Sequence, residues 1–153
     1  MAIEIPAHFP DWVREHLESY LDSDGADGHL WDAEPFGGKG MIPTLLLTTT
    51  GRKSGKPTQL PLIYGEVPGG YAVIGSKGGA PKHPGWYENL TQNPDVQLQV
   101  VDETFDARAR TASGDERETI WRQLADLYPP FDDYAKKAAP REIPVVVLER
   151  SQA

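Results

Sequence analysis

The amino-acid sequence predicts an α+β protein in which a small six-stranded β-barrel is flanked by helices. Six short stretches are apolar and rich in β-branched residues, a composition typical of strands. Helical periodicity occurs near both ends of the chain and in one insertion between strands. Strands and helices do not alternate as they would in a Rossmann fold, so we expect a barrel rather than a doubly wound sheet.

The chain has 153 residues, within the usual size of one domain, and we expect residues 1–153 to form a single barrel domain. Residues 1–22 should contain an N-terminal amphipathic helix, residues 23–43 a loop, and residues 44–149 the barrel. The helix is expected over 11–22, where apolar residues recur at helical spacing behind a proline. The residues on this stripe are Trp12, Val13, His16, Leu17, Tyr20 and Leu21.

The barrel strands are expected where apolar runs are bounded by turn residues. They cover residues 44–50, 59–64, 71–75, 96–101, 104–111 and 143–148. Pro68, Gly69 and Gly70 are turn formers between the second and third strands, so the first three strands predict a β-meander. Two further helices are expected over 84–90 and 116–127.

The composition weighs against several classes of function. Cysteine is absent, which excludes disulfides and thiolate chemistry and fits a cytoplasmic protein. The net charge of −8 weighs against binding of nucleic acid, and the four histidines lack the spacing of a metal site. No apolar run reaches the roughly 20 residues that cross a bilayer. Peripheral attachment through residues 11–22 remains as a weak alternative, because Arg14 is the only lysine or arginine there, against several acidic residues.

A basic turn stands out in this acidic chain. Residues 48–58 read TTTGRKSGKPT and place Arg52, Lys53 and Lys56 between glycines directly after an apolar run. The spacing does not match a Walker phosphate loop, so an ATP site is not expected. Arginine and exposed backbone N–H groups bind phosphate or carboxylate well, so we interpret the turn as an anion site. A solvated hairpin turn is the alternative reading.

A second glycine-rich loop, GSKGGAP over residues 75–81, follows the third strand. Its spacing does not match the dinucleotide-binding fingerprint. We expect it to share one rim with the basic turn, because both loops follow strands of the predicted meander. Trp86 and Tyr87 come shortly after it and could stack on a planar ring, although core packing is an equal alternative for both. Together these features predict a site for a planar, phosphorylated cofactor.

The chain resembles the deazaflavin (coenzyme F420)-dependent nitroreductase family of mycobacteria and related actinobacteria. The resemblance lies in LLLTTTGRKSG (45–55), in GSKGGAPKHPGWYENL (75–90) followed by Asn93 and Pro94, and in YPP (128–130) with REIPV (141–145). It spans about Leu45 to Glu149. It implies a split β-barrel of the FMN-binding type and coenzyme F420 as the cofactor. The lactyl-phosphate and glutamate tail of that coenzyme would account for the basic turn.

The resemblance also implies roles for individual residues. The implied coenzyme-binding residues are Arg52, Lys53, Lys56, Ser76, Lys77, Gly78, Gly79, Pro84, Trp86, Tyr87 and Asn89. Tyr128 and Tyr134 match tyrosines of the substrate pocket, and with Ser76 they are the implied catalytic residues. Thr58 stands where many relatives carry arginine, and Ile63 and Phe131 stand where the nitroreductase namesake has tyrosine. These differences imply a substrate range unlike that of the namesake.

We therefore expect an F420H2-dependent oxidoreductase that passes hydride to an electron-poor small molecule, such as an activated alkene, a quinone or a nitro compound. The alternative is a non-catalytic carrier of a deazaflavin, another flavin or an amphiphile. The electron acceptor is the expected small-molecule partner. Neither binding of nucleic acid nor stable insertion into a membrane is expected. The sequence leaves monomer and homodimer open.

Overall fold

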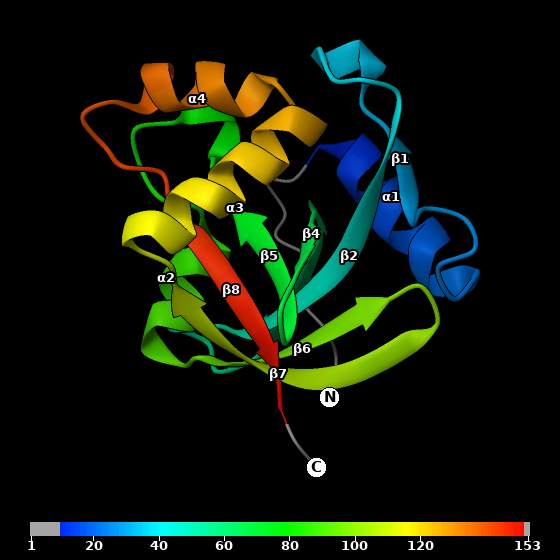
Figure 1. The fold of residues 1–153 in the computed structure, drawn as a ribbon. Coiled ribbons are helices and arrows are strands. Elements are labelled where there is room, and N and C mark those ends of the chain that lie inside the picture. Colours follow the sequence, from blue (N-terminus) through cyan, green and yellow to red (C-terminus); the bar gives the residue numbers. More distant parts are fainter. Residues whose placement is uncertain (1–9, 152–153) are drawn as a thin grey trace.

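A computed structural model describes residues 10–151. Its centre is a strongly curled, antiparallel sheet that forms half a barrel, with helices packed around it (Figure 1). The strands pair in the order β1-β2-β6-β7-β8-β5-β4, and β3 pairs with β2 off this path. The strands are β1 (Leu30–Asp32), β2 (Met41–Thr50), β3 (Pro57–Ile63), β4 (Gly65–Val67), β5 (Gly70–Ile74), β6 (Asp95–Val100), β7 (Glu103–Thr111) and β8 (Val145–Arg150).

The helices are α1 (Asp11–Asp22), α2 (Gly85–Gln92), α3 (Gly114–Leu127) and α4 (Pro130–Ala138), with short 3₁₀ turns at Glu34–Phe36 and Lys77–Gly79. Helix α1 confirms the expectation for residues 11–22. Residues 1–9, the rest of the expected N-terminal segment, lie outside the described part of the chain. Between residues 10 and 151 no helix combines the length and apolar character needed to cross a bilayer.

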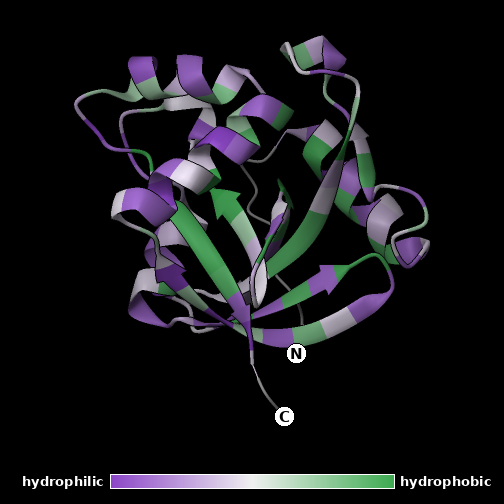
Figure 2. Cartoon of the chain, viewed as in Figure 1, coloured by the Kyte–Doolittle hydropathy of each residue, from purple (hydrophilic) through white to green (hydrophobic). Residues whose placement is uncertain are grey.

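The core is divided between the two faces of the curled sheet. In β8, Val145 and Val147 pack with α3 and α4, whereas Val146 and Leu148 pack into the hollow of the sheet with Leu98. Both sets are buried because side chains alternate along a strand and both faces of β8 are covered. Strands β2, β5 and β8 are accordingly apolar along much of their length, while the helices carry polar residues (Figure 2).

The sheet differs from the prediction in strand number and order. It has eight strands rather than six, because the three-residue strands β1 and β4 were not expected. The predicted meander is wrong: β3 pairs with β2, whereas β5 pairs with β4 and β8. The turn at Pro68 and Gly69 joins β4 to β5 instead of joining β3 to β5. A three-residue strand is too short to show periodicity, and pairing between distant strands leaves no local signal.

Two segments expected to lack regular structure contain some. The expected loop over 23–43 holds β1, a 3₁₀ turn and the start of β2. Residues 130–138 form helix α4, whose Phe131 and Ala138 are buried on the side that meets the core. Pro129 and Pro130 read as a rigid turn in the sequence, but proline is also favoured at the first positions of a helix.

The hydroxyl of Tyr64 lies 2.8 Å from Nε2 of His29. Burial, followed by the neighbouring charges of Tyr20 and Tyr71, raises the pKa of Tyr64 to about 12. Because the pKa of Tyr64 is raised in the folded state, its contribution to the unfolding free energy is fully present below the unfolded pKa of 10.0. That contribution is lost as the pH rises towards 12. We expect the wild type to lose up to about 2–3 kcal/mol of unfolding free energy over this range through Tyr64. Urea unfolding at several alkaline pH values should show a smaller loss in Tyr64→Phe; an identical loss in both proteins would contradict the expectation.

Candidate functional site

A small cavity lies where α1, β3, the end of β5 and α4 approach one another. Its volume is about 180 Å³. Its walls are mostly apolar and aromatic, and it is called the aromatic cavity below. The lining residues are Trp12, Val13, His16, Trp31, Thr44, Pro61, Leu62, Ile63, Ile74, Ser76, Tyr128, Phe131 and Tyr134. Because small-molecule pockets usually hold roughly 300–1,000 Å³, this cavity encloses only part of a large ligand or of a pair of ligands, and the remainder must lie over its rim.

The rim of the aromatic cavity is itself aromatic. Trp12 of α1 stacks on Trp31 of β1 with ring centroids 5.9 Å apart, and Phe36 approaches both rings at 5.0 and 5.2 Å. Trp12 and Phe36 remain 44% and 42% exposed, unlike core aromatics. The sequence placed Trp12 on the expected helix over 11–22 but assigned no role to Trp31 or Phe36. The strand that carries Trp31 has only three residues and shows no periodicity.

Two of the expected catalytic residues form a pair in this cavity. The hydroxyls of Tyr128 and Tyr134 lie 2.9 Å apart. Tyr128 is only 4% exposed. Burial and the hydrogen bond with Tyr134 raise the pKa of Tyr128 well above its usual value. The Tyr128 phenol therefore stays neutral near pH 7, where it can orient a ligand but is a poor proton donor.

Ser76, the third expected catalytic residue, also lines the cavity and begins the glycine-rich loop. The next three residues all have positive φ: 47° at Lys77, 62° at Gly78 and 83° at Gly79. Ser76 itself has right-handed dihedrals (φ −74°, ψ −38°), and a right-handed residue followed by left-handed Lys77 turns successive N–H groups towards one side, as in an anion-binding nest. The N–H groups of Gly79 and Ala80 donate within the loop, to the carbonyls of Ser76 and Lys77, so the nest is formed at Ser76 and Lys77. The loop thus places an anion-binding surface directly beside the aromatic cavity.

The glycine-rich loop is held in place by Arg141, which sequence reasoning did not assign to the site. The Arg141 guanidinium donates to the carbonyls of Gly75 (3.2 Å), Ser76 (2.8 Å) and Ala80 (2.9 Å). It also lies 3.1 Å from Nδ1 of His83, which can accept from it. With its carbonyls turned to Arg141, the loop is fixed on that side by a charged side chain. No motif marks this role, because the contacts are to backbone atoms.

Gly79 and Gly78 differ in how closely other atoms approach them, which provides a matched pair of substitutions. A Cβ atom at Gly79 would lie 2.9 Å from the backbone oxygen of Tyr134, whereas one at Gly78 would meet nothing within 4 Å. We expect Gly79→Ala to lower the unfolding free energy by about 2–3 kcal/mol, from strain plus displacement of α4. Gly78→Ala should cost about 1 kcal/mol, from strain alone. Urea unfolding measures both, and equal losses would contradict this account.

The basic turn between β2 and β3 is tied to α2 rather than free in solvent. Oδ1 of Asn89 accepts from the backbone N–H of Arg52 at 3.1 Å and from its Nη1 at 2.8 Å. Nη2 of Arg52 lies 3.0 Å from Glu88. Lys53 and Lys56 are exposed on the same turn. Part of the Arg52 guanidinium is thus used to fix the turn, and the two lysines add positive charge around it.

The expected coenzyme-binding residues of α2 have structural contacts in this structure. Asn89 is 5% exposed, and its Nδ2 donates to the hydroxyls of Thr49 at 3.1 Å and Thr58 at 3.4 Å. Trp86 is buried in the hollow of the sheet, which favours the core alternative for it. Tyr87 contributes its hydroxyl to a 2.9 Å contact with Thr111. Thr58 thus belongs to the Asn89 network.

The structure groups the predicted site residues into two neighbouring sets. Ser76, Tyr128 and Tyr134 meet at the aromatic cavity, and Ile63 and Phe131 line it as well. Arg52 and Asn89 meet at the basic turn, where Arg52 also donates to the Gly85 carbonyl at 3.3 Å. The segment from Ser76 through buried Pro84 to Gly85 connects the two sets along the chain. An elongated ligand could therefore lie between them.

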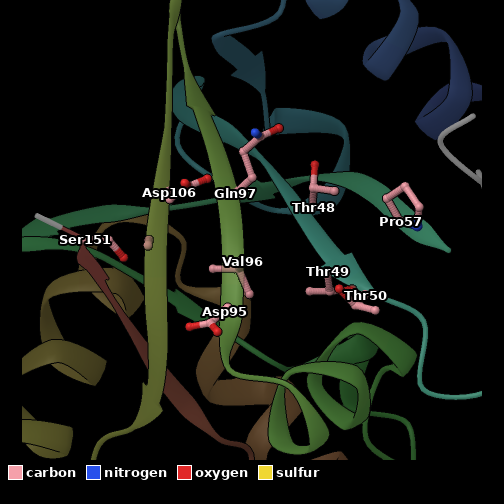
Figure 3. Close-up of a pocket in the computed structure, with 10 residues that line it drawn as sticks. Thr48, Thr49, Thr50, Pro57, Asp95, Val96, Gln97, Asp106 and Ser151 are labelled. Atoms are coloured by element: carbon pink, nitrogen blue, oxygen red, sulfur yellow. The ribbon is translucent and has the colours of Figure 1, made fainter. Parts of the chain in front are cut away.

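A second, wider hollow of about 530 Å³ opens on β2, β6 and β7 next to the basic turn. Figure 3 shows Thr48, Gln97 and Asp106 on its wall, with Asp95 further along. Its lining has two carboxylates and no lysine, arginine or histidine. Because a polyanionic ligand would be repelled there, the candidate site is the aromatic cavity with the glycine-rich loop and the basic turn.

Comparison with known proteins identifies the family of this chain. Residues 12–150 match the model of the F420H(2)-dependent quinone reductase family. The chain belongs to this family. An F420H(2)-dependent quinone reductase of Mycobacterium tuberculosis (Rv1261c) is 33% identical over 141 residues, which cover 90% of this chain and 89% of the relative.

Two solved structures resemble this member of the quinone reductase family. The structure of an F420-H2 dependent reductase (FDR-A) is 46% identical with a TM-score of 0.64, covering 70% of this chain and 94% of that one. A chain described as a domain-swapped dimer is 43% identical with a TM-score of 0.66, covering 91% of this chain and 98% of that one. The α+β fold with a curled antiparallel sheet is thus that of F420-dependent reductases.

Coenzyme F420 is the cofactor of the quinone reductase family, and the residues of this site fit it chemically. The aromatic cavity suits a flat deazaflavin ring. The positive-φ run from Lys77 to Gly79 and the cations of the basic turn suit the phosphate and carboxylates of its tail. The chain is accordingly an F420-dependent reductase.

Proposed function

We propose that this protein reduces a quinone by hydride transfer from reduced F420, with the deazaflavin ring in the aromatic cavity. The tail would run past Ser76 and Gly79 towards Arg52. The observation that carries this proposal is the junction of an aromatic cavity with an Arg141-held loop of positive-φ residues. When bound, the reduced coenzyme supplies the hydride; the protein positions the two reactants and excludes water.

Two features of the cavity support a quinone over a nitro compound as the acceptor. Ile63 and Phe131 add apolar surface to its lining at the positions where the nitroreductase namesake has hydroxyls. The exposed rings of Trp12 and Phe36 offer a second apolar surface at its rim. A flat, weakly polar acceptor matches both surfaces.

The residues of the site have different roles in this proposal. Arg141 holds the loop, and the loop with Lys77 binds the phosphate. Arg52, Lys53 and Lys56 attract the carboxylates of the tail. Tyr128 and Tyr134 act as neutral hydroxyls that orient the ring or the acceptor. Asn89 and Trp86, both on α2, support the site from inside: the first fixes Arg52, and the second anchors the helix in the hollow of the sheet.

The test is a titration of the purified protein with oxidised F420, followed by oxidation of the reduced coenzyme with menadione, cyclohexenone and a nitroimidazole offered separately. We expect coenzyme binding and fastest oxidation with menadione. Faster oxidation with cyclohexenone or the nitroimidazole would overturn the choice of acceptor. Binding without oxidation by any acceptor would favour the carrier alternative. Absence of coenzyme binding would overturn the assigned position of the site.

The assembly of the chain stays a prediction, with monomer and homodimer both open. The relative described as a domain-swapped dimer supports the homodimer. Light scattering coupled to size-exclusion chromatography, at several protein concentrations, would distinguish the two states.

A further inference from the structure

Reduction of a quinone needs a proton as well as a hydride, and few side chains of the aromatic cavity can supply it. Hydride addition gives the acceptor two electrons and one hydrogen, leaving a hydroquinone anion whose oxygen must still be protonated. The lining side chains with exchangeable protons, apart from the Trp12 and Trp31 indoles, are His16, Thr44, Ser76, Tyr128 and Tyr134. No aspartate, glutamate or lysine lines the cavity.

Most of these groups are poor acids in this setting. Burial raises the pKa of Tyr128, and its hydroxyl also forms a hydrogen bond with the hydroxyl of Tyr134. Thr44 is 2% exposed, and its hydroxyl donates to the Gly28 carbonyl at 2.8 Å. Aliphatic hydroxyls such as those of Ser76 and Thr44 do not ionise near neutral pH. Imidazole is the side chain whose charge changes in that range.

The contacts of His16 fix which of its nitrogens is available. Its Nε2 lies 2.8 Å from the carbonyl oxygen of Gly28, and a carbonyl can only accept. Nε2 therefore carries a hydrogen, which leaves Nδ1 as the nitrogen that can take up and release a proton. The ring lies nearly parallel to Trp31, at 8° and 6.5 Å between centroids, which holds its plane. His16 is half-buried, so solvent can restore its proton.

We propose that His16 is a catalytic residue of this reductase, donating the proton at Nδ1 to the acceptor oxygen. The proposal rests on the function proposed above. The N–H bond of the imidazolium breaks, an O–H bond of the hydroquinone forms, and the imidazole takes a proton from solvent. The acceptor gains one hydride and one proton in total, while reduced F420 is oxidised.

The first readout compares His16→Gln with a matched control, His29→Gln. His29 is bonded to the Tyr64 hydroxyl and does not line the cavity. General acid catalysis contributes about 10²–10⁴-fold, so kcat with menadione should fall at least about 100-fold in His16→Gln at low pH. The wild-type kcat should decline as pH rises between about 5 and 8, and this decline should be absent from the variant. His29→Gln should keep both the wild-type kcat and its pH profile.

The second readout is binding alone and needs no turnover. The anion of 2-hydroxy-1,4-naphthoquinone resembles the intermediate that His16 would protonate, whereas 1,4-naphthoquinone is a neutral control. With oxidised F420 bound, the wild type should bind the anion less tightly as pH rises through the histidine range, and should bind the neutral quinone equally throughout. Among the described residues, Tyr20 contacts the His16 ring, and Tyr128 and Tyr134 line the same cavity. Burial raises the pKa of Tyr20 and of Tyr128, so neither of these two phenols becomes charged near pH 7.

The outcomes separate the two proposals. A wild type that binds coenzyme but leaves menadione unreduced overturns the proposed function and, with it, the role of His16. An active wild type whose kcat and pH profile are retained in His16→Gln overturns only the role of His16. Should that variant fail to fold by circular dichroism, the binding of the two naphthoquinones to the wild type decides: an anion affinity independent of pH overturns the proposal, and the expected decline supports it.

Discussion

Replacement of Arg141 by methionine is expected to lower the unfolding free energy by about 3–4 kcal/mol and to weaken binding of oxidised F420 by at least about 30-fold. The substitution keeps much of the aliphatic volume but removes the donors to three carbonyls and to His83. Hydrogen bonds from a charged donor contribute roughly 1.5–3 kcal/mol each, and the losses here are partly offset by water reaching the loop. Urea unfolding and quenching of coenzyme fluorescence measure the two effects.

Two other arginine variants serve as controls for this result. Arg122 is an exposed arginine that pairs with Asp132 at 3.4 Å, and Arg122→Met should change stability by less than about 0.5 kcal/mol. Arg141→Lys keeps the charge but lacks the fork that reaches several carbonyls at once, so it should lie between wild type and Arg141→Met. Coenzyme affinity unchanged in Arg141→Met would show that the loop does not depend on this residue.

Replacement of Asn89 by alanine is the second change with a large expected effect, a loss of about 3–4 kcal/mol of unfolding free energy. The amide of Asn89 serves Arg52 through its oxygen and Thr49 and Thr58 through its nitrogen. Because Thr49 is only 1% exposed, water cannot readily replace the lost partner. The freed Arg52 should also weaken coenzyme binding. Chemical denaturation and the fluorescence titration measure these changes.

Gln92, an exposed residue near the end of the same helix, provides the matched control. Gln92→Ala should stay within about 0.5 kcal/mol of the wild type, because it removes no buried hydrogen bond. Asn89→Asp keeps the acceptor for Arg52 but loses the two donated bonds and buries a charge, so it should also be destabilised. A stable Asn89→Asp with normal coenzyme affinity would show that only the contact with Arg52 matters.

The fold was predictable from sequence for most segments long enough to show a period; helix α4 is the exception, because it begins at the second of two consecutive prolines. Helix α1 and the six longer strands have this property, and all of them were found. Strands β1 and β4 have three residues each and show none. The strand order was not predictable, because β5 pairs with β8 from the far end of the chain and local patterns carry no information on that pairing.

The candidate site was predictable where side chains carry the chemistry. Arg52, Ser76, Tyr128 and Tyr134 were named because their residue types bind anions or line pockets. Arg141 was missed as a site residue because it acts on backbone carbonyls, which no residue pattern reveals. His16 was read as one more member of a helix stripe, since its position against Trp31 and Gly28 exists only in the folded chain. The function of each depends on tertiary contacts.

Strand β2 also sets the scale of length for a ligand that contacts both parts of the site. It lines the aromatic cavity at Thr44 and leads directly into the basic turn at Gly51. At about 3.3 Å per residue, this stretch spans up to about 23 Å. A mononucleotide flavin, whose phosphate lies only a short ribityl chain from its ring, has less reach between the cavity and the basic turn than F420 with its longer tail. The protein would thus favour flavins long enough to contact both parts of the site, because strand β2 keeps the separation of these parts fixed.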